Sequence, residues 1–209
     1  MPAFAWSEAQ SFESAFWGNC TNTLIEELKQ STYARYMGLI ATHDPTHDFC
    51  YDLAGASVLD LGGGPVSLLL KCTNLGAGSR VVDPCPFPPW VGERYRCAGL
   101  DLIPVKAEEI PLSQLPSPNS YAEAWIYNVL QHVDDPAKII ANAKTLAPRL
   151  RIFEWINFPA YAGHPQALTA AKLEAWIGQP GSSTLLQGEN GCHGQCFYGN
   201  FVHAAAPPR

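Results

Sequence analysis

The chain has 209 residues, of which 47% are apolar and 15% charged, and this composition fits a folded domain with a modest extension rather than a disordered chain. The net charge is −6 and the 13 basic residues form no dense cluster, so duplex nucleic acid is not an expected partner, because phosphate contacts dominate its binding. No apolar run approaches the roughly 20 residues that cross a bilayer, and the N-terminus lacks a secretory pattern, so we predict a cytoplasmic protein without membrane contact.

Residues 1–52 precede the first predicted strand of the main sheet and are predicted to form a helical, aromatic-rich extension. Thr23-Leu-Ile-Glu26 matches a capping box, in which the two side chains satisfy backbone N–H groups at the start of a helix. The apolar stripe predicted to face inward consists of Leu24, Leu28, Tyr36 and Leu39. We therefore expect an extension over 1–52 and a main domain over 53–209.

The stretch Ser57-Val-Leu-Asp-Leu-Gly-Gly-Gly-Pro-Val-Ser67 predicts a strand, a glycine turn and a helix. Val58, Leu59 and Leu61 form a short apolar run typical of a central parallel strand. The glycines follow at once, where Cβ atoms would block a sharp turn or the approach of a ligand. Pro65 suits the first turn of a helix, because its missing N–H has no intrahelical partner there.

Two ligand classes compete for this turn. A dinucleotide fingerprint needs glycines at its first, third and sixth positions, which here are Gly62, Gly64 and Ser67, so the third glycine is absent. Asp60 places a carboxylate just before the turn, where it would attract an ammonium group and repel a pyrophosphate. A ligand with a cationic amino-acid end therefore fits better than a dinucleotide.

Asp60-Leu-Gly-Gly-Gly-Pro65 resembles the first motif of the class I (Rossmann-like) S-adenosylmethionine-dependent methyltransferases. This resemblance implies a three-layer α/β fold with a mostly parallel seven-stranded sheet and an antiparallel last strand. It also implies S-adenosyl-L-methionine as the cofactor and S-adenosyl-L-homocysteine as the product. The cofactor-binding candidates that follow from the motif are Asp60, Gly62, Gly63 and Gly64.

N-terminal extensions in this family commonly cover the cofactor and shape the acceptor pocket. By this resemblance, Trp17 and Asn19 are candidates for cofactor contact, and Tyr33 and Met37 for substrate contact. The competing expectation for most aromatic residues of the extension is burial in the core.

Arg80-Val-Val-Asp83 predicts the second strand, which ends in an acid about twenty residues beyond the glycine turn. One carboxylate can accept hydrogen bonds from both ribose hydroxyls, and dinucleotide and S-adenosylmethionine sites both use this contact. Asp83 is therefore the predicted ribose ligand. The proline-dense segment after it favours a rigid loop, and Pro84 is expected beside the adenosine.

Residues 102–106 predict a third strand, which Pro104 shortens, and residues 107–112 its exit loop. Many members of the family have an aspartate here that binds the adenine amino group, whereas this chain has Lys106. The resemblance therefore leaves two candidates for the adenine contact, the backbone N–H of Ala107 and the side chain of Glu108.

Residues 121–128 predict the fourth strand, and the following turn leads to a helix that Asp135 is expected to cap. The resemblance makes Asn128 and Val129 cofactor-binding candidates at the methionine and methyl end. His132 in the same turn is a candidate base for an acceptor hydroxyl, and a packing role is its alternative.

Residues 150–156 predict the fifth strand, and a long aromatic loop over 157–168 leads to a helix that Thr169 can cap. Loops at this edge of a parallel sheet face the ligand. His164 in this loop is therefore a candidate catalytic base, and Tyr161 a candidate substrate-binding residue. A surface role is the alternative for His164.

The end of the chain predicts two strands, the second rich in aromatic residues. Cys192 and Cys196 with one intervening histidine form a lone C-x3-C without a second pair, so we predict no metal site there. Residues 43–48 hold two histidines and two aspartates, but Pro45 between them favours a polar loop. The seven cysteines are expected to be reduced thiols.

The resemblance implies transfer of a methyl group to an O or N atom of a small-molecule acceptor. Two alternatives remain: a methyltransferase-like module that binds S-adenosylmethionine without catalysis, and a nicotinamide-dependent oxidoreductase. The sequence identifies neither the acceptor nor an oligomeric state.

Overall fold

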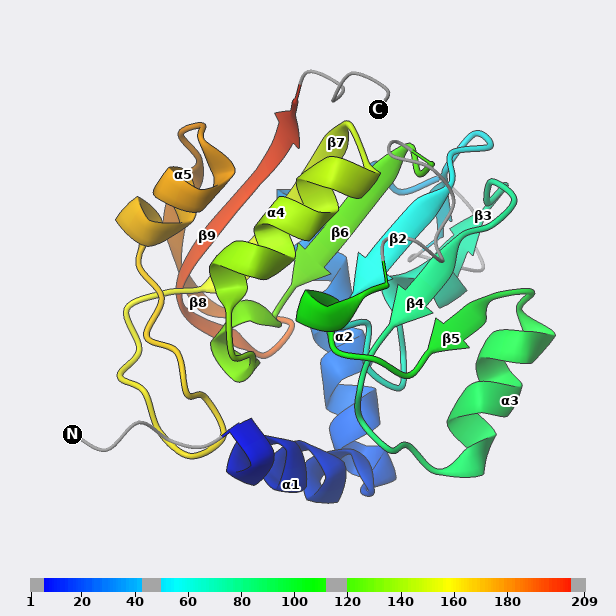
Figure 1. Cartoon of the computed structure of the whole chain (residues 1–209), viewed down its shortest axis with the longest axis horizontal. Coiled ribbons are helices and arrows are strands. Elements are labelled where there is room, and N and C mark those ends of the chain that lie inside the picture. Colours follow the sequence, from blue (N-terminus) through cyan, green and yellow to red (C-terminus); the bar gives the residue numbers. More distant parts are fainter. Residues whose placement is uncertain (1–5, 43–49, 112–119, 204–209) are drawn as a thin grey trace.

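The computed structural model describes residues 6–42, 50–111 and 120–203, which form a three-layer α/β fold (Figure 1). A seven-stranded sheet has the order β5-β4-β2-β6-β7-β9-β8. Its strands are β2 (Val58–Leu61), β4 (Arg80–Val82), β5 (Asp101–Ile103), β6 (Glu123–Tyr127), β7 (Arg149–Trp155), β8 (Ser182–Glu189) and β9 (Cys192–Val202). The pairs among β5, β4, β2, β6 and β7 are parallel, whereas β9 is antiparallel to both β7 and β8. The predicted fold class is confirmed.

The two faces of the sheet carry different helices because side chains alternate along each strand. On one face, Leu59, Ile126 and Ile152 pack with α4 (Pro136–Leu146) and α5 (Ala170–Ile177). On the other face, Trp125 and Phe153 pack with α2 (Cys20–Tyr36) and α3 (Pro89–Cys97). A small second sheet pairs β1 (Tyr51–Asp52) in parallel with β3 (Cys72–Thr73).

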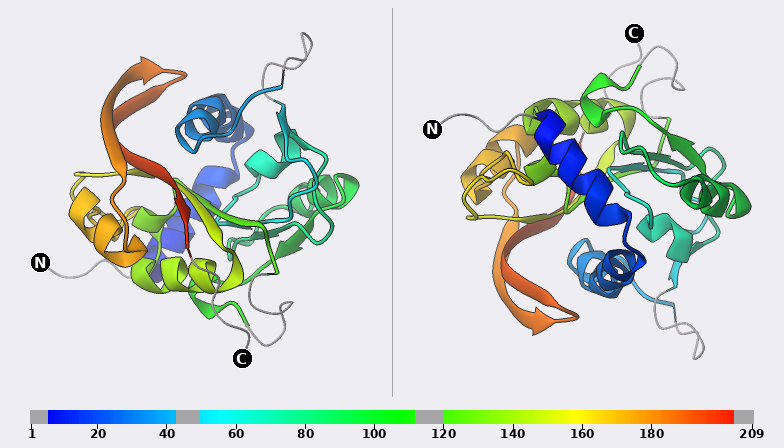
Figure 2. Two further views of the ribbon diagram at one scale, coloured as in Figure 1. Left: turned by 90° about the horizontal axis from the view of Figure 1, so that it is seen from above. Right: turned by 90° about the horizontal axis from the view of Figure 1, so that it is seen from below.

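Helix α1 (Trp6–Trp17) belongs to neither face. It crosses the end of the sheet at which the parallel strands finish, as the right-hand view of Figure 2 shows. Three short 3-10 helices lie along this edge or near it: η1 (Leu68–Lys71), η2 (Ala107–Glu109) and η3 (Leu130–His132). The extension therefore supplies α2 to one face of the sheet and α1 to the edge at which the parallel strands end.

The prediction of a helix starting directly after the glycine turn is wrong, because the chain forms only the short 3-10 helix η1 there. Two tyrosine hydroxyls hold the backbone at the start of η1. The Ser67 N–H donates to the Tyr95 hydroxyl at 2.8 Å, and the Leu68 N–H donates to the Tyr127 hydroxyl at 2.9 Å. Tyr95 belongs to α3, a helix that starts at Pro89 within the segment predicted as a rigid loop.

The predicted start and inward stripe of α2 are also wrong in part. The helix begins at Cys20, so Thr23 lies inside it rather than at its cap. Leu24 and Leu28 are 58% and 50% exposed, while Glu26 and Gln30 are buried in their place. Among the side chains of α2 that the structure describes, the buried apolar ones lie in its second half, where it packs against β6 and β7.

Later predictions are confirmed. The Asp135 side chain accepts a hydrogen bond from the Lys138 N–H at the start of α4, and Thr169 caps α5 in the same way. Gly178 ends α5 in the left-handed conformation, with φ of 81°. The two strands expected at the end of the chain are β8 and β9.

Candidate functional site

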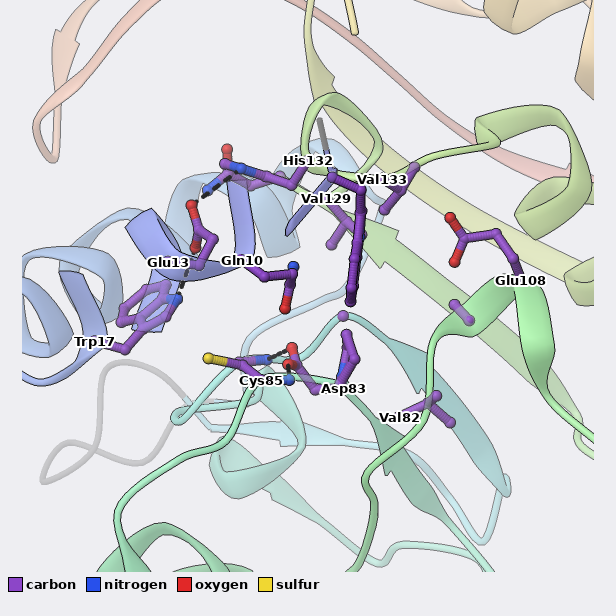
Figure 3. Close-up of a pocket in the computed structure, with 16 residues that line it drawn as sticks. Gln10, Glu13, Trp17, Val82, Asp83, Cys85, Glu108, Val129, His132 and Val133 are labelled. Atoms are coloured by element: carbon purple, nitrogen blue, oxygen red, sulfur yellow. Dashed lines mark hydrogen bonds and ion pairs between the residues drawn. The ribbon is translucent and has the colours of Figure 1, made fainter. Parts of the chain in front are cut away.

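A cavity lies between the carboxyl ends of the parallel strands and α1 (Figure 3). The sheet edge contributes Gly62 and Gly64 after β2, Val82, Asp83, Pro84 and Cys85 at the end of β4, Ala107 and Glu108 in η2, and Asn128, Val129, His132 and Val133 after β6. Helix α1 contributes Trp6, Gln10, Glu13 and Trp17. In open α/β sheets this edge is where ligands bind.

The glycine turn forms one wall of the cavity, and its shape depends on the absence of side chains. Gly62 has φ of 80°, and a Cβ placed there would lie 2.5 Å from a Val129 methyl group. Gly64 has φ of 63°, and its carbonyl accepts the Tyr95 hydroxyl at 2.6 Å. Gly63 does not line the main cavity but faces Asp60 and Val81 below the turn.

Asp60 lies beneath the turn rather than in the cavity. It is fully buried and accepts hydrogen bonds from the Ser67 and Tyr127 hydroxyls. Burial raises the pKa of this carboxyl to about 7. The side chain therefore holds the glycine turn in place, and the expected attraction of a ligand ammonium and repulsion of a pyrophosphate have no support from its position.

Asp83 does face the cavity. Its Oδ2 accepts the Gly64 N–H at 3.0 Å and its Oδ1 accepts the Cys85 N–H at 2.9 Å. Burial raises its pKa to about 6, although both backbone donors favour the charged form. Each oxygen retains acceptor capacity, so the carboxylate can receive two neighbouring hydroxyls.

Glu108 stands across the cavity from Asp83, as Figure 3 shows. Its Oε1 accepts the backbone N–H groups of Asp134 and Asp135, which fixes the carboxylate against the end of η3. Lys106 points elsewhere: its Nζ pairs with Asp134 at 3.0 Å and lies 3.6 Å from the centroid of the Trp6 ring. The residue that departs from the family pattern thus contacts α1.

Glu13 on α1 joins the cover of the cavity to the turn after β6. Its carboxylate lies 3.1 Å from His132 Nδ1 and accepts the Trp17 indole N–H at 2.9 Å (Figure 3). Burial alone would raise the pKa of Glu13, but the bond to His132 and the charge of His132 outweigh it and lower the pKa. For His132, burial lowers the pKa, but the contacts led by Glu13 raise it by more, so the pKa lies above its ordinary value.

The hydrogen bonds around His132 continue to α2. Gln131 Nε2 lies 3.1 Å from His132 Nε2 and donates to Asn128 Oδ1 at 2.8 Å. Asn128, with φ of 58°, donates from Nδ2 to Glu26 Oε1 at 3.1 Å. His132 Nδ1 faces two acceptors, the Glu13 carboxylate and the Gly163 carbonyl at 2.9 Å, so neutral His132 carries its proton on Nδ1. Both helices of the extension thus contact the turn through a carboxylate.

His164 and Tyr161 lie beside His132 but do not line the cavity. The rings of His132 and His164 meet edge to face, with centroids 4.4 Å apart. His164 Nε2 lies 3.1 Å from the Tyr161 hydroxyl. Burial, together with the nearby charge of His132, lowers the pKa of His164 to about 4, so this ring is neutral at pH 7.

Three residues of the extension lie away from the main cavity. Tyr33 and Met37 are fully buried among the residues that α2 packs against β6 and β7, and Asn19 is exposed. This position fits the competing expectation of core packing for Tyr33 and Met37. Conversely, the sequence interpretation omitted Trp6, Gln10 and Glu13. Their spacing with Trp17, at intervals of four, three and four residues, places them on one helical face and was the available signal.

The described residues hold neither a metal-ligand cluster nor a membrane-spanning helix. Within these ranges no group of three or more His, Cys, Asp or Glu side chains is arranged to hold a metal ion. Cys192 and Cys196 are buried in β9, and residues 43–48 lie outside the described residues. In the described part of the chain, no helix combines the length and apolar character that a bilayer span requires.

No protein-family model and no curated protein matches the sequence. Solved structures do match the fold. The N-methyltransferase NodS from Bradyrhizobium japonicum, in complex with S-adenosyl-L-homocysteine, is 13% identical with a TM-score of 0.61, over 94% of this chain and 98% of that one. A SAM-dependent methyltransferase from Leishmania major is 12% identical with a TM-score of 0.64, over 94% and 82%. A possible histamine N-methyltransferase from Thermotoga maritima is 13% identical with a TM-score of 0.58, over 95% of each chain.

Sheet order and cavity position define a Rossmann-like α/β protein with its site at the carboxyl edge of the strands. Within that class, the antiparallel β9 and the matching structures identify a narrower group. The fold of this chain is that of the class I S-adenosylmethionine-dependent methyltransferases.

Proposed function

We propose that the protein binds S-adenosylmethionine in the cavity and transfers its methyl group to an O or N atom of a small-molecule acceptor. The observation that carries the proposal is the position of Asp83. Its carboxylate is held by two backbone N–H groups at the carboxyl end of β4 and faces the cavity with acceptor capacity on both oxygens. Ribose hydroxyls are the ligand groups that such a carboxylate suits.

The other residues of the sheet edge fit the remaining parts of the cofactor. Glu108 and the backbone of Ala107 suit the adenine amino group, with Pro84 beside the adenosine. Gly62, Gly64 and Asn128 lie at the opposite end, where the methionyl part is expected, with Trp17 of α1 above it. The structures with similar folds include complexes with S-adenosylhomocysteine and with S-adenosylmethionine, which supports this assignment.

Bound S-adenosylmethionine supplies an activated methyl group on a sulfonium, so the protein's tasks are alignment and exclusion of water. Helix α1 is suited to the second task, because four of its side chains line the cavity opposite the strand ends. For a hydroxyl acceptor, His132 is the proposed base, since it lines the cavity and Glu13 holds its Nδ1. The acceptor's proton would go to Nε2, which requires the Gln131 amide to turn away from that nitrogen. His164 and Tyr161 are proposed to contact the acceptor, His164 being too weak a base when its pKa is about 4.

No observation in the described part of the chain favours the oxidoreductase alternative. The argument from Asp60 no longer opposes it, but the antiparallel β9 differs from the dinucleotide-binding sheet, and the three matching structures reported above are named as methyltransferases. Binding without catalysis has no specific observation in its favour and is an outcome of the test below.

Calorimetric titration with S-adenosylmethionine, S-adenosylhomocysteine and NAD tests the proposal. We expect micromolar binding of both sulfur ligands, no binding of NAD, and at least about tenfold weaker binding by Asp83→Asn. Asp101→Asn is the matched control, because the Asp101 side chain is 74% exposed at the far edge of the sheet. Failure of both sulfur ligands to bind would refute the proposal.

Turnover separates an enzyme from a binding module. S-Adenosylhomocysteine release is measured with panels of small phenols, alcohols and amines, in the wild type and in His132→Asn and His164→Asn. A base at His132 predicts a large loss with hydroxyl acceptors and a small loss with amines that arrive neutral. Tight cofactor binding without turnover on any acceptor would favour the non-catalytic module.

A further inference from the structure

A small second compartment adjoins the main cavity beside the glycine turn. It shares Gly62, Gly64, Trp17 and Asn128 with that cavity, so the two are continuous around the Trp17 side chain. Its further walls come from Glu26 and Gln30 of α2, the turn from Gly63 to Val66, and Tyr127. The compartment therefore lies at the end of the cavity where the methionyl part is proposed to bind.

Glu26 is the carboxylate that lines this compartment. Its residue is 9% exposed, and its Oε1 accepts a hydrogen bond from Asn128 Nδ2 at 3.1 Å. The Tyr33 hydroxyl is also close enough for this carboxylate to contribute to the raised pKa of Tyr33. The other oxygen pairs with Lys29 at 3.3 Å, on the solvent side of α2, where the Lys29 side chain is 25% exposed. A carboxylate oxygen can accept two hydrogen bonds, so Oε1 has capacity for another donor.

Glu26 is the charged side chain of the compartment's lining, whereas Lys29 and Lys71 contact Glu26 and Gln30 without lining it. Among the described residues that line it, none is a lysine or an arginine, and the remaining polar walls are amide, hydroxyl and backbone groups. Gln30 is already engaged, because its Nε2 donates to the Val66 carbonyl and its Oε1 accepts from Lys71. Trp17 and Tyr127 add aromatic rings, which tolerate an ammonium group.

The orientation of α2 is the second, independent observation. This helix turns Glu26 and Gln30 inward and leaves Leu24, Ile25 and Leu28 exposed, which reverses the usual amphipathic arrangement. Burying a carboxylate in place of a leucine costs stability unless the charge has partners, and the partners of Glu26 are Lys29 on one oxygen and Asn128 on the other. The arrangement is understandable if the inward face of this half of α2 serves a polar ligand.

We infer that Glu26 recognises the primary amino group of the cofactor's methionyl end. The role rests on the proposed function, since it concerns the same ligand. It replaces the role first expected of Asp60, whose carboxylate lies fully buried beneath the turn with the Ser67 and Tyr127 hydroxyls as partners. An ammonium donating to Glu26 Oε1 would complete that oxygen's acceptor capacity through a charge-assisted hydrogen bond.

Two ligands isolate this contact. S-Adenosylhomocysteine carries the amino-acid end, whereas 5′-methylthioadenosine has the same nucleoside and thioether sulfur without it. We expect Glu26→Gln to weaken S-adenosylhomocysteine binding about 10- to 100-fold in calorimetry and to leave methylthioadenosine binding within about twofold, because only the former loses a hydrogen bond to a charged group.

Glu27→Gln is the matched control on the same helix. Glu27 pairs with Arg94 and lines a separate surface pocket, so neither ligand should bind it differently from the wild type. If Glu26→Gln does not fold, Glu26→Asp retains the charge on a shorter side chain. Its loss of ligand affinity should again be confined to S-adenosylhomocysteine.

The outcomes separate the inference from the proposed function. Unchanged S-adenosylhomocysteine binding in a folded Glu26→Gln protein would refute the role of Glu26 while the cofactor assignment stands. An equal loss for both ligands would also refute it, because it would mean that Glu26 acts through the shape of the cavity and Asn128. Failure of the wild type to bind either ligand would refute the proposed function itself.

Discussion

The cavity is bounded by two regions that hold their functional groups by different means. At the sheet edge, backbone N–H groups fix the carboxylates: Gly64 and Cys85 hold Asp83, and Val129 and Leu130 hold Glu154 at 3.0 Å. In the extension, side chains hold one another, as in the pairs Glu13–His132 and Lys106–Trp6.

This difference predicts different responses to change. Backbone contacts at the sheet edge form with the fold itself, so their loss should reduce both stability and ligand binding. Side-chain pairs of the kind that attach α1 contribute on the order of 1 kcal/mol each. Their loss should therefore affect ligand binding more than unfolding.

The largest expected effect concerns pH and the buried acids of the sheet edge. Burial raises the pKa of Glu154 to about 7 and of Asp60 to about 7, both above their values in an unfolded chain. Because these pKa values are raised, the stability that depends on the protonated forms is complete below about pH 4 and is lost as the pH rises through about 7. Between pH 5 and pH 8 these two groups should lower the free energy of unfolding by roughly 5 kcal/mol.

Urea denaturation across this pH range measures the effect. The free energy of unfolding should fall less steeply with pH in Glu154→Gln than in the wild type. The difference in slope should correspond to at most about one bound proton. The extension acid Glu13 behaves oppositely, since its pKa is lowered. Glu13→Gln should keep the decrease that comes from the buried acids and lose only the part that comes from the raised pKa of His132. Equal slopes in all three proteins would show that the buried sheet-edge acids are not the source.

A glycine pair tests the sheet edge next. Gly62 and Gly78 have nearly the same φ, 80° and 82°, so alanine should strain both backbones by about 1–2 kcal/mol. At Gly62 the new Cβ would also lie 2.5 Å from a Val129 methyl group, whereas nothing lies within 4 Å at Gly78. Gly62→Ala should therefore lose about 1–3 kcal/mol more in urea denaturation and bind S-adenosylhomocysteine far more weakly. Equal losses of stability in the two variants would mean that Val129, in the turn after β6, moves aside at little cost.

The attachment of α1 has a smaller expected effect on stability. Glu13→Gln removes the ion pair with His132, and we expect about tenfold weaker S-adenosylhomocysteine binding with a loss of no more than about 1–2 kcal/mol in unfolding. Glu8→Gln, an exposed acid in the first turn of the same helix, is the control and should change neither by more than a few tenths of a kcal/mol. A stability loss without a binding loss would contradict the comparison.

The same division explains what the sequence could predict. The glycine turn, Asp83 and the turn after β6 follow strands in chain order, so local patterns located them and the sheet brought them together. Trp6, Gln10 and Glu13 were missed because their role depends on where α1 docks, which no local pattern records. Tertiary contacts also accompany two errors: Tyr95 and Tyr127 hold the backbone where an α-helix was expected, and a polar compartment receives the inward face of α2.

Lys106 offers the mildest test of the extension. Its Nζ lies over the Trp6 ring and pairs with Asp134, but the side chain is 22% exposed, so solvent weakens both contacts. Lys106→Met should cost at most about 1 kcal/mol in unfolding and weaken S-adenosylhomocysteine binding about twofold to fivefold in calorimetry. Lys138→Met, at an exposed lysine of α4, is the control and should leave binding unchanged. A loss at Lys106 as large as that of Asp83→Asn would mean that the extension is as essential to the site as the sheet edge, and would overturn the distinction between the two regions.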